Sequence, residues 1–243
     1  MIKNLPKVKK FISFHNPSGE DIIRSLGLLN KENPLVIDVG ANTGQTIDSI
    51  LSINPAAEIY SFEPTPGLVG GLIERYKENK NVKISDIALS DRKGELDFFT
   101  SEFSPTNSLL EPNTKIYAEL DSVLYKTLSD SKKVKVKADT FDEWYLKNGN
   151  SRLIDLMKID TQGTEYEVLK GSILNLKTNI KAVCIELQFL PFYKGCNPFY
   201  ESIKLLYENG FVLFSLYENN KRSNMQLVES NGLFINTSLF KYT

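Results

Sequence analysis

The sequence predicts an α/β fold with a mostly parallel sheet and helices on both of its faces. Residues 35–39 form an apolar, β-branched run that leads into a glycine-containing turn, and residues 45–53 continue with helical apolar spacing. The same succession of strand and helix recurs at residues 57–76 and 153–171. Such units build parallel sheets, because each helix carries the chain back to the start of the next strand.

Composition places the chain among ordinary globular proteins. Its 243 residues suffice for one large core, and its net charge of −1 gives no general attraction to nucleic acid or to a membrane surface. No apolar run reaches the ~18 residues that span a bilayer. Residues 1–10 carry four lysines, but the apolar stretch of a signal peptide does not follow. We therefore expect a cytoplasmic protein, without assigning its oligomeric state.

Histidine and cysteine are too scarce for several common kinds of site. Cys184 and Cys196 match no zinc-ligand spacing, and any Ser-His-Asp triad or multi-histidine metal centre would depend on His15 alone. We interpret His15 as a surface or lid residue and expect no metal site.

Each element is predicted from the spacing of its apolar residues. A helix over 19–29 covers one sheet face, so residues 1–33 form a helical cover to a single domain over 34–243. Thr140 and Glu143 form a capping-box pattern, which assigns Glu143 to capping rather than to chemistry. The other expected strands are 57–62, 82–89, 94–100 (antiparallel), 134–137, 153–160, 181–187, 211–216 and 232–235, and the other expected helices are 68–76, the stretch ending at 171, and 199–207.

Residues 101–133 interrupt the succession of strand and helix. Residues 104–108 have the composition of a loop, and residues 116–124 have the apolar spacing of a short amphipathic helix. We predict that this segment is a lid-like insertion over the substrate. The alternative is an elaboration that only adds packing.

The turn after the first strand indicates which ligand the protein binds. Its glycines, Gly40 and Gly44, match neither the G-x-G-x-x-G dinucleotide pattern nor a phosphate loop. Asp38 would repel a pyrophosphate but attract an ammonium or sulfonium group, as in S-adenosylmethionine. Asn42 or Thr43 can cap the following helix. An ordinary turn beside a satisfied aspartate is the alternative.

Residues after the second and third strands complete this predicted site. Pro64 keeps Glu63 out of helical geometry at the end of its strand. An acid about 20 residues beyond such a turn binds ribose hydroxyls in nucleotide-binding folds. Asp86 could accept a hydrogen bond from an adenine amino group, or could be a turn residue, and Ile87 could pack on the ring. Together with the turn, these residues predict a site for an adenosine-bearing ligand.

Charged residues near the ends of later strands are the catalytic candidates. Lys158 and Asp160 share one strand face, and charges there are costly unless they are paired or functional. Lys158 could pair with Asp38 on the neighbouring strand, or take part in catalysis. Asp160 caps no obvious helix, so we favour it as the base or as a group that orients the acceptor. Glu186 would then hold the substrate.

Several sequence blocks occur together in a fixed order. They are residues 38–44, 62–64, 88–91, 107–109, 157–165, 168–171 and 190–195. Over about residues 34–218, these blocks resemble the FkbM-type family of S-adenosylmethionine-dependent methyltransferases. The resemblance implies a class I methyltransferase, Rossmann-like sheet of seven strands, the last antiparallel. It also implies methylation of a hydroxyl, often on a sugar or another secondary metabolite.

On this resemblance the cofactor is S-adenosylmethionine and the substrate is a small molecule or a glycan precursor. We place Asn107, Ser108, Gln162 and Glu165 against the substrate, although Glu165 could instead serve a helix dipole. The Gly70-Gly71 pair and the length of residues 111–133 depart from the family pattern and leave the substrate open.

Two other functions are consistent with parts of the sequence. One is a cofactor-binding module without catalysis, in which the strand-end charges are structural. The other is a nicotinamide-dependent oxidoreductase, which the missing G-x-G-x-x-G disfavours.

Overall fold

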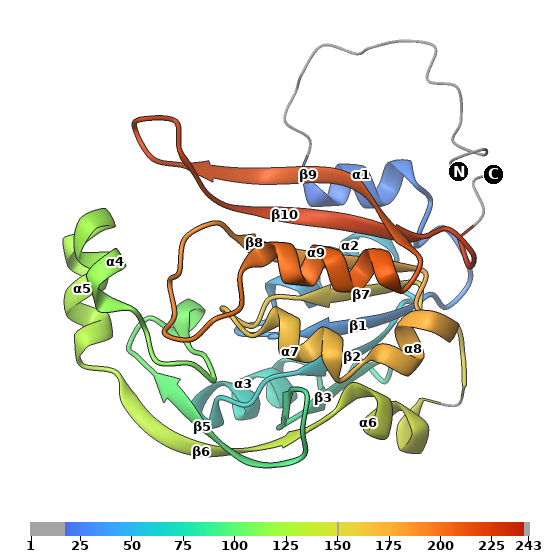
Figure 1. Ribbon diagram of the computed structural model, residues 1–243. Helices are drawn as coiled ribbons and strands as arrows, with labels where there is room; N and C mark the ends of the chain where they lie inside the picture. Colours follow the sequence, from blue (N-terminus) through green and yellow to red (C-terminus); the bar gives the residue numbers. More distant parts are fainter. Residues whose placement is uncertain (1–17, 150, 241–243) are drawn as a thin grey trace.

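A computed structural model describes residues 18–149 and 151–240 of the chain. A seven-stranded sheet forms its centre, in the order β3-β2-β1-β7-β8-β10-β9 (Figure 1). Five strands pair in parallel, and β10 runs antiparallel to both of its neighbours. This confirms the predicted sheet. The strands are β1 (Leu35–Val39), β2 (Glu58–Phe62), β3 (Val82–Ser85), β7 (Leu156–Ile159), β8 (Ala182–Gln188), β9 (Phe211–Lys221) and β10 (Leu227–Asn236).

Helices cover both faces of this sheet, as predicted. Strand β1 alternates between the two cores, with Ile37 in one and Val36 in the other, so a fully apolar strand serves both faces. On one face lie α1 (Gly19–Ser25), α2 (Gln45–Ile53) and α3 (Pro66–Tyr76), and on the other lie α6 (Phe141–Asn148), α7 (Glu165–Lys170), α8 (Ile173–Thr178) and α9 (Phe199–Glu208).

The register of β2, β1 and β7 brings the carboxyl ends of these three strands together. Val39 of β1 is paired with Phe62 of β2 on one side and with Ile159 of β7 on the other. The residues that follow these three positions therefore emerge side by side at one edge of the sheet. Ligands of open α/β sheets bind at such an edge.

The single strand expected over 82–89 is wrong, because the chain leaves the sheet after Ser85. Asp86 is exposed, and residues 88–89 form β4 (Ala88–Leu89) in a second sheet of order β4-β6-β5. The other strands are β5 (Gly94–Thr100), which is antiparallel as predicted, and β6 (Lys132–Asp139). Ala88 packs with Phe98 and Val136 in a small separate core, which favours the second sheet.

The insertion contains a short 3-10 helix (Ser104–Thr106) and two α-helices rather than the one that we expected. These are α4 (Thr114–Leu120) and α5 (Ser122–Ser129). Asp121 separates them, because its extended backbone ends α4 while its carboxylate accepts hydrogen bonds from Val123 and Leu124 at the start of α5. Both helices lie at the side of the molecule towards which the tip of the β9–β10 hairpin extends (Figure 1).

Other boundaries differ more modestly from the expectations. Helix α1 ends at Ser25, shortly before Gly27 with its φ of +63°. The Thr140 side chain caps α6 as predicted, but the Glu143 carboxylate pairs with Lys147 at 3.4 Å instead of completing the capping box. His15 and the rest of residues 1–17 lie outside the described residues.

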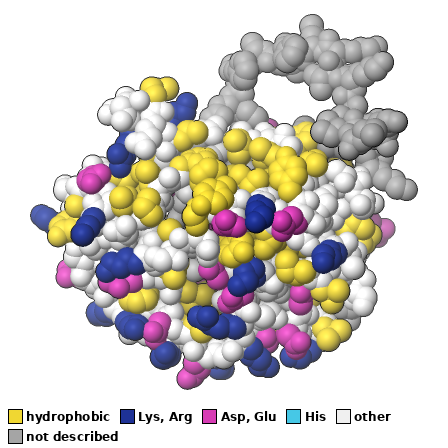
Figure 2. Space-filling view, viewed as in Figure 1, with side chains coloured by type: hydrophobic (Ala, Val, Ile, Leu, Met, Phe, Trp, Pro, Cys, Tyr) yellow, Lys and Arg dark blue, Asp and Glu magenta, His cyan; other side chains and the backbone are white. Residues whose placement is uncertain are grey.

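Strands β9 and β10 extend beyond the sheet as a hairpin, so both are longer than their apolar cores predicted. Apolar side chains gather over the region of α9 and β9 in Figure 2. The exposed large residues there include Tyr200, Tyr207, Leu213 and Leu216, and none of the four lines the cavity described below. Among the helices of the described residues, none is both long and apolar enough for a bilayer crossing.

Candidate active site

A cavity of about 740 Å³ opens at the carboxyl ends of β1, β2 and β7. Gly40, Asn42, Glu63 and Ile87 line one end of it, which we call the cofactor end. The other end reaches the insertion and the β9–β10 hairpin, and we call it the acceptor end. Its lining includes Tyr117, Leu120, Leu124, Phe192, Val228 and Glu229.

Position 40 requires glycine, because a side chain there would clash with the neighbouring backbone. Its φ is +90°, and a Cβ on it would lie 1.9 Å from the carbonyl oxygen of Asp160. The N–H groups of Gly40 and Ala41 both donate to the carbonyl oxygen of Phe62 at 3.0 Å. The loop after β1 is thus held by the main chains that follow β2 and β7.

Glu63 is 5% exposed and braces the same loop. Its Oε2 accepts a hydrogen bond from the Asn42 N–H at 2.7 Å, and its Oε1 accepts one from the Thr65 N–H at 2.8 Å. Burial raises the pKa of Glu63, while hydrogen bonds from the Thr65 side chain and from these two N–H groups partly offset that rise. The carboxylate keeps a lone pair for a ligand hydroxyl.

The predicted cofactor residues divide into two groups. Those that line the cavity are Gly40, Asn42, Glu63, Pro64 and Ile87. Thr43 and Asp86 are exposed outside it, and Asp38 and Gly44 are buried behind its wall, so these four predicted residues do not line the cavity. Gly44, not Asn42 or Thr43, is the N-cap of α2, because the Asn42 side chain instead accepts a hydrogen bond from Ser104 at 3.0 Å.

Asp38 is completely buried beneath the loop. Its Oδ2 accepts a hydrogen bond from the Ser61 hydroxyl at 2.6 Å, whereas Oδ1 has no hydrogen-bond partner in the described part of the chain. Burial raises the pKa of Asp38 to about 6, although Ser61 and Lys158 oppose the rise. A cationic group above the loop would stabilise the charged form of this carboxylate.

Lys158 pairs with Asp160 rather than with Asp38. Lys158 and Asp38 are register partners on β7 and β1, but the Lys158 Nζ lies 2.9 Å from Asp160 Oδ2. Residues two apart on a strand share a face, which makes this partner accessible. Asp38 turns to Ser61 on its other neighbouring strand.

One glutamine joins Asp160 and Glu186, the two carboxylates that are the catalytic candidates. The Gln162 Nε2 donates to Asp160 Oδ1 at 2.8 Å and to Glu186 Oε2 at 3.1 Å. Gln188 donates a second hydrogen bond to the same Glu186 oxygen at 2.7 Å, and its own Oε1 is buried without a partner in the residues described. Asp160, Glu186, Gln162 and Gln188 all line the cavity.

The pKa values of the two carboxyl groups are shifted in opposite directions. Burial raises the pKa of Asp160, but the Lys158 ammonium and hydrogen bonds from Lys158 and Gln162 outweigh burial and lower it overall. Burial raises the pKa of Glu186 well above its usual value, and the charges of Asp160, Glu165 and Glu229 raise it further. Asp160 therefore stays ionised at neutral pH, whereas Glu186 holds a proton more readily.

Glu165, which we placed against the substrate, does not line the main cavity. Its carboxylate accepts hydrogen bonds from the N–H groups of Thr161 at 2.8 Å and Gly163 at 3.0 Å, because the loop turns back over it. Burial raises the pKa of Glu165 to about 7. Its position fixes the backbone on either side of Gln162, whose φ is +58°.

Asn107 and Ser108 also have different roles. Asn107 lines the cavity, whereas Ser108 is buried outside the lining and donates to the Gln162 carbonyl at 2.7 Å. Tyr193, which we did not predict, donates to Gln162 Oε1 at 2.9 Å and thereby sets the orientation of that amide. Its block, residues 190–195, was the signal for this role.

The cavity residues from the hairpin were also missed, among them Asn220, Lys221 and Glu229. No motif marks them, since only the hairpin's pairing carries them to the cavity. Across residues 18–149 and 151–240, no group of three or more His, Cys, Asp or Glu side chains is placed to hold a metal ion.

Comparison with known proteins identifies the family. The model described as "Methyltransferase FkbM domain" matches residues 38–213. The chain belongs to this family. It is therefore a methyltransferase and not an oxidoreductase, and its cofactor is S-adenosylmethionine, as the sequence predicted.

The individual proteins that are similar to the chain share only a minority of their aligned residues with it. The chain is 26% identical over 188 residues to the 2-O-methyltransferase NoeI of Sinorhizobium fredii (strain NBRC 101917 / NGR234), covering 74% of each protein. It is 32% identical over 156 residues to the methyltransferase sdnD of Sordaria araneosa, covering 57% of this chain and 60% of that protein. The magnesium protoporphyrin IX methyltransferase (ChlM) structure from Synechocystis PCC 6803 has a TM-score of 0.48 and 11% identity, and covers 89% of this chain and 76% of that one.

The residues at the cofactor end fit S-adenosylmethionine. Glu63 offers buried acceptors for ribose hydroxyls, and Ile87 with Pro64 offers an apolar surface for the adenine ring. Gly40 leaves the loop open where a side chain would fill it. The unpartnered Oδ1 of Asp38 supplies negative charge beneath a cationic ligand.

Proposed function

We propose that this protein transfers a methyl group to a hydroxyl oxygen of a small molecule, a sugar or glycan precursor. The observation that carries the proposal is the pair of carboxylates, Asp160 and Glu186, bonded to one amide and facing the cavity beside the glycine loop. An alcohol needs an acceptor for its proton, and this pair provides one. The name of the relative NoeI, a 2-O-methyltransferase, agrees with an oxygen acceptor.

The bound cofactor supplies a methyl group that its sulfonium already activates. The protein therefore has to place the acceptor oxygen in line with the methyl carbon and to remove a proton. With the cofactor bound, the acceptor oxygen would bond to the methyl carbon as the carbon–sulfur bond breaks, and a carboxylate would take the hydroxyl proton.

The opposite pKa shifts divide the work between the two acids. Asp160, fixed by Lys158 and ionised, orients the hydroxyl by accepting its hydrogen bond. Glu186, with its raised pKa, is the better final acceptor of the proton once it is ionised. Gln162 holds the two carboxylates in place relative to each other, and Lys158 holds Asp160 without touching the substrate.

Transfer of labelled methyl from S-adenosylmethionine to a panel of sugars, glycosides and fractionated cell extract tests the proposal. We expect label in a product that survives mild alkali, since a methyl ether is stable where a methyl ester is not. Label found only on nitrogen, or only in alkali-labile ester, would overturn the assignment to a hydroxyl.

Asp160→Asn tests the catalytic assignment. The amide keeps the size of the side chain but loses the charge that Lys158 and the hydroxyl require, so turnover should fall by ~100-fold or more. Calorimetric affinity for S-adenosylhomocysteine should stay near the wild-type value. Glu143→Gln, an exposed change on α6, is the matched control, and near-normal turnover of Asp160→Asn would transfer the role to Glu186 alone.

A further inference from the structure

The acceptor end has an apolar wall that the reaction itself does not require. Five of its residues come from α4, α5, the loop after β8 and strand β10, and belong to one hydrophobic cluster. All five also line the cavity; they are Tyr117, Leu120, Leu124, Phe192 and Val228.

This wall begins beside the catalytic carboxylates. Tyr193 belongs to the same cluster, and its hydroxyl bonds Gln162, which bonds both Asp160 and Glu186. The pKa of Tyr117 is raised to about 12 by burial and by the charges of Glu186 and Glu229, in keeping with its place next to them. A molecule whose hydroxyl reaches the carboxylates would therefore lie against apolar side chains.

The wall faces the cavity rather than bulk solvent. On α5, Leu124 is half-buried and lines the cavity, whereas the adjacent Val123 is 72% exposed and does not. Val228 of β10 packs on the same cluster and also lines the cavity. Apolar surface left in contact with water is unfavourable, and an apolar ligand would remove it from water.

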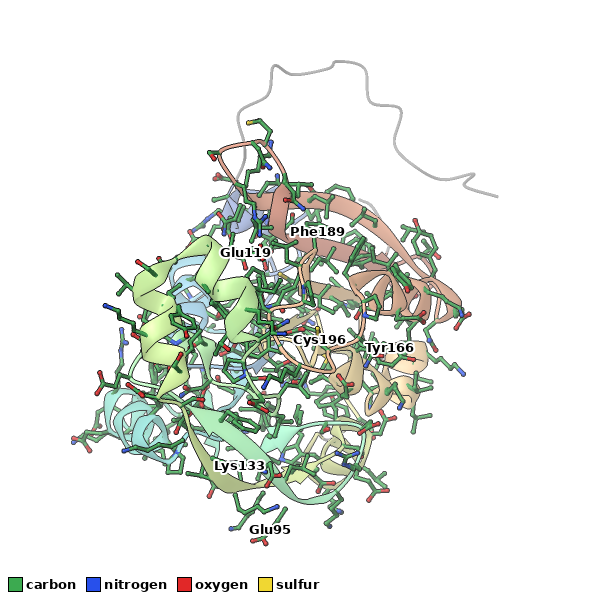
Figure 3. All side chains as sticks on the ribbon, turned by 60° about the vertical axis from the view of Figure 1, so that its left-hand side comes forward. Glu95, Glu119, Lys133, Tyr166, Phe189 and Cys196 are labelled. Atoms are coloured by element: carbon green, nitrogen blue, oxygen red, sulfur yellow. The ribbon has the colours of Figure 1, made fainter. Side chains whose placement is uncertain are left out.

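The two sides of this end also meet at its rim. Glu119 on α4 lies 3.7 Å from the guanidinium of Arg222, which directly follows β9. Figure 3 shows Glu119 at the end of the insertion helices that faces the hairpin. Lys221 and Asn220 line the cavity beside it. The apolar wall thus has a polar, charged border, as expected for a site that takes an amphiphilic molecule.

We propose that the acceptor is amphiphilic and carries an aliphatic chain close to the hydroxyl that is methylated. This inference rests on the proposed function, because the reactive hydroxyl is placed by Asp160 and Glu186. The chain packs along Leu120, Leu124 and Val228, and the polar part of the molecule lies towards the carboxylates and the charged rim.

Calorimetric binding of methyl and hexyl β-glucoside to the full chain saturated with S-adenosylhomocysteine tests the proposal, with both glucosides below micelle-forming concentrations. A fully buried methylene raises affinity about fourfold. Even with partial burial of the chain, hexyl glucoside should bind at least about tenfold more tightly than methyl glucoside. Equal or undetectable binding of both glucosides would overturn the proposal.

Substitutions at two neighbouring residues of α5 test whether the preference for the longer chain arises at the apolar wall. Leu124→Asp should abolish the preference for the longer chain, and the milder Leu124→Ala should reduce it if the charged variant folds poorly. Val123→Asp adds the same charge outside the cavity and should keep the preference. Loss of the preference in Val123→Asp, or its persistence in both Leu124 variants, would contradict the assigned wall.

The two proposals fail in different ways. Methyl transfer to a hydroxyl without any dependence on chain length would leave the proposed function intact and reject the apolar wall. Tight binding of hexyl glucoside without methyl transfer to any hydroxyl would support the apolar wall and reject the proposed function.

Discussion

The two ends of the cavity are built by different means. At the cofactor end, main-chain groups hold the loop: Gly40 and Ala41 donate to Phe62, and Asn42 donates to Glu63. At the acceptor end, side chains from α4, α5, the loop after β8 and β10 form the surface. Main-chain groups join these segments behind it: the Asn113 N–H donates to the Phe192 carbonyl and the Phe189 N–H donates to the Val228 carbonyl.

This difference predicts how each end tolerates change. A loop fixed by backbone hydrogen bonds and close approach allows few residue types at each position. A wall of partly buried apolar side chains accepts many combinations of similar volume. The cofactor end should therefore respond to small substitutions with large losses, while the acceptor end should respond mainly in substrate choice.

The largest effect should come from Gly40→Ala. The new Cβ would meet the Asp160 carbonyl at 1.9 Å in a backbone conformation that alanine rarely adopts, so we expect a loss of about 3 kcal/mol or more in unfolding free energy. Gly70→Ala in α3 is the control, since nothing lies within 4 Å of its Cβ, and it should be neutral or stabilising by up to about 1 kcal/mol. Urea denaturation measures the change in unfolding free energy of both variants. Similar changes for the two variants would contradict the prediction.

Asp38 should make the stability of the cofactor end depend on pH. Its folded pKa of about 6 exceeds the usual 3.8, so the folded protein holds this proton more tightly than the unfolded chain does. The resulting stabilisation is present below about pH 4 and is lost as the pH rises to about 6, by an amount on the order of 3 kcal/mol. Asp38→Asn cannot ionise, so its stability relative to wild type should improve over that range. A constant difference from pH 4 to 7 would show that Asp38 titrates normally.

Glu63→Gln should weaken the binding of the cofactor. The amide keeps one acceptor for the backbone, but it loses the hydrogen bond to the second N–H group and the charge-assisted hydrogen bonds, each worth ~1.5–3 kcal/mol, to the ribose hydroxyls. We expect calorimetric affinity for S-adenosylhomocysteine to fall by roughly 10- to 100-fold. Glu58→Gln, at the opposite end of β2, should leave that affinity unchanged. Equal affinity of Glu63→Gln and wild type would remove Glu63 from the cofactor site.

The smallest effect concerns the insertion. Residues 104–124 should exchange backbone hydrogens faster without ligands than with S-adenosylhomocysteine and an acceptor bound, because binding packs side chains against α4 and α5. The loop around Gly40 should change less, since its hydrogen bonds are already formed. Exchange that is equally slow in both states would show that the insertion is packed core and not a lid.

Much of the sheet and the cofactor end could be predicted from the sequence, because local patterns determine them. The apolar run of β1, the positive-φ glycine after it and the acid at the end of β2 are each readable in a short window. Local patterns describe less well where a residue lies relative to the cavity. Thr43 and Asp86 are near the right strand ends, but backbone turns carry them outside the cavity.

The partners of the charged residues depended on the tertiary structure. The sequence determined that Lys158, Asp160 and Glu186 would lie near strand ends, since strand positions follow from apolar spacing. It could not determine that Gln162 joins the two carboxylates, that Glu165 turns back to its own loop, or that Tyr193 orients the amide. Those contacts depend on side-chain directions set by segments up to 31 residues apart, from Gln162 to Tyr193. Packing between distant segments fixes such directions, and no short stretch of sequence contains that information.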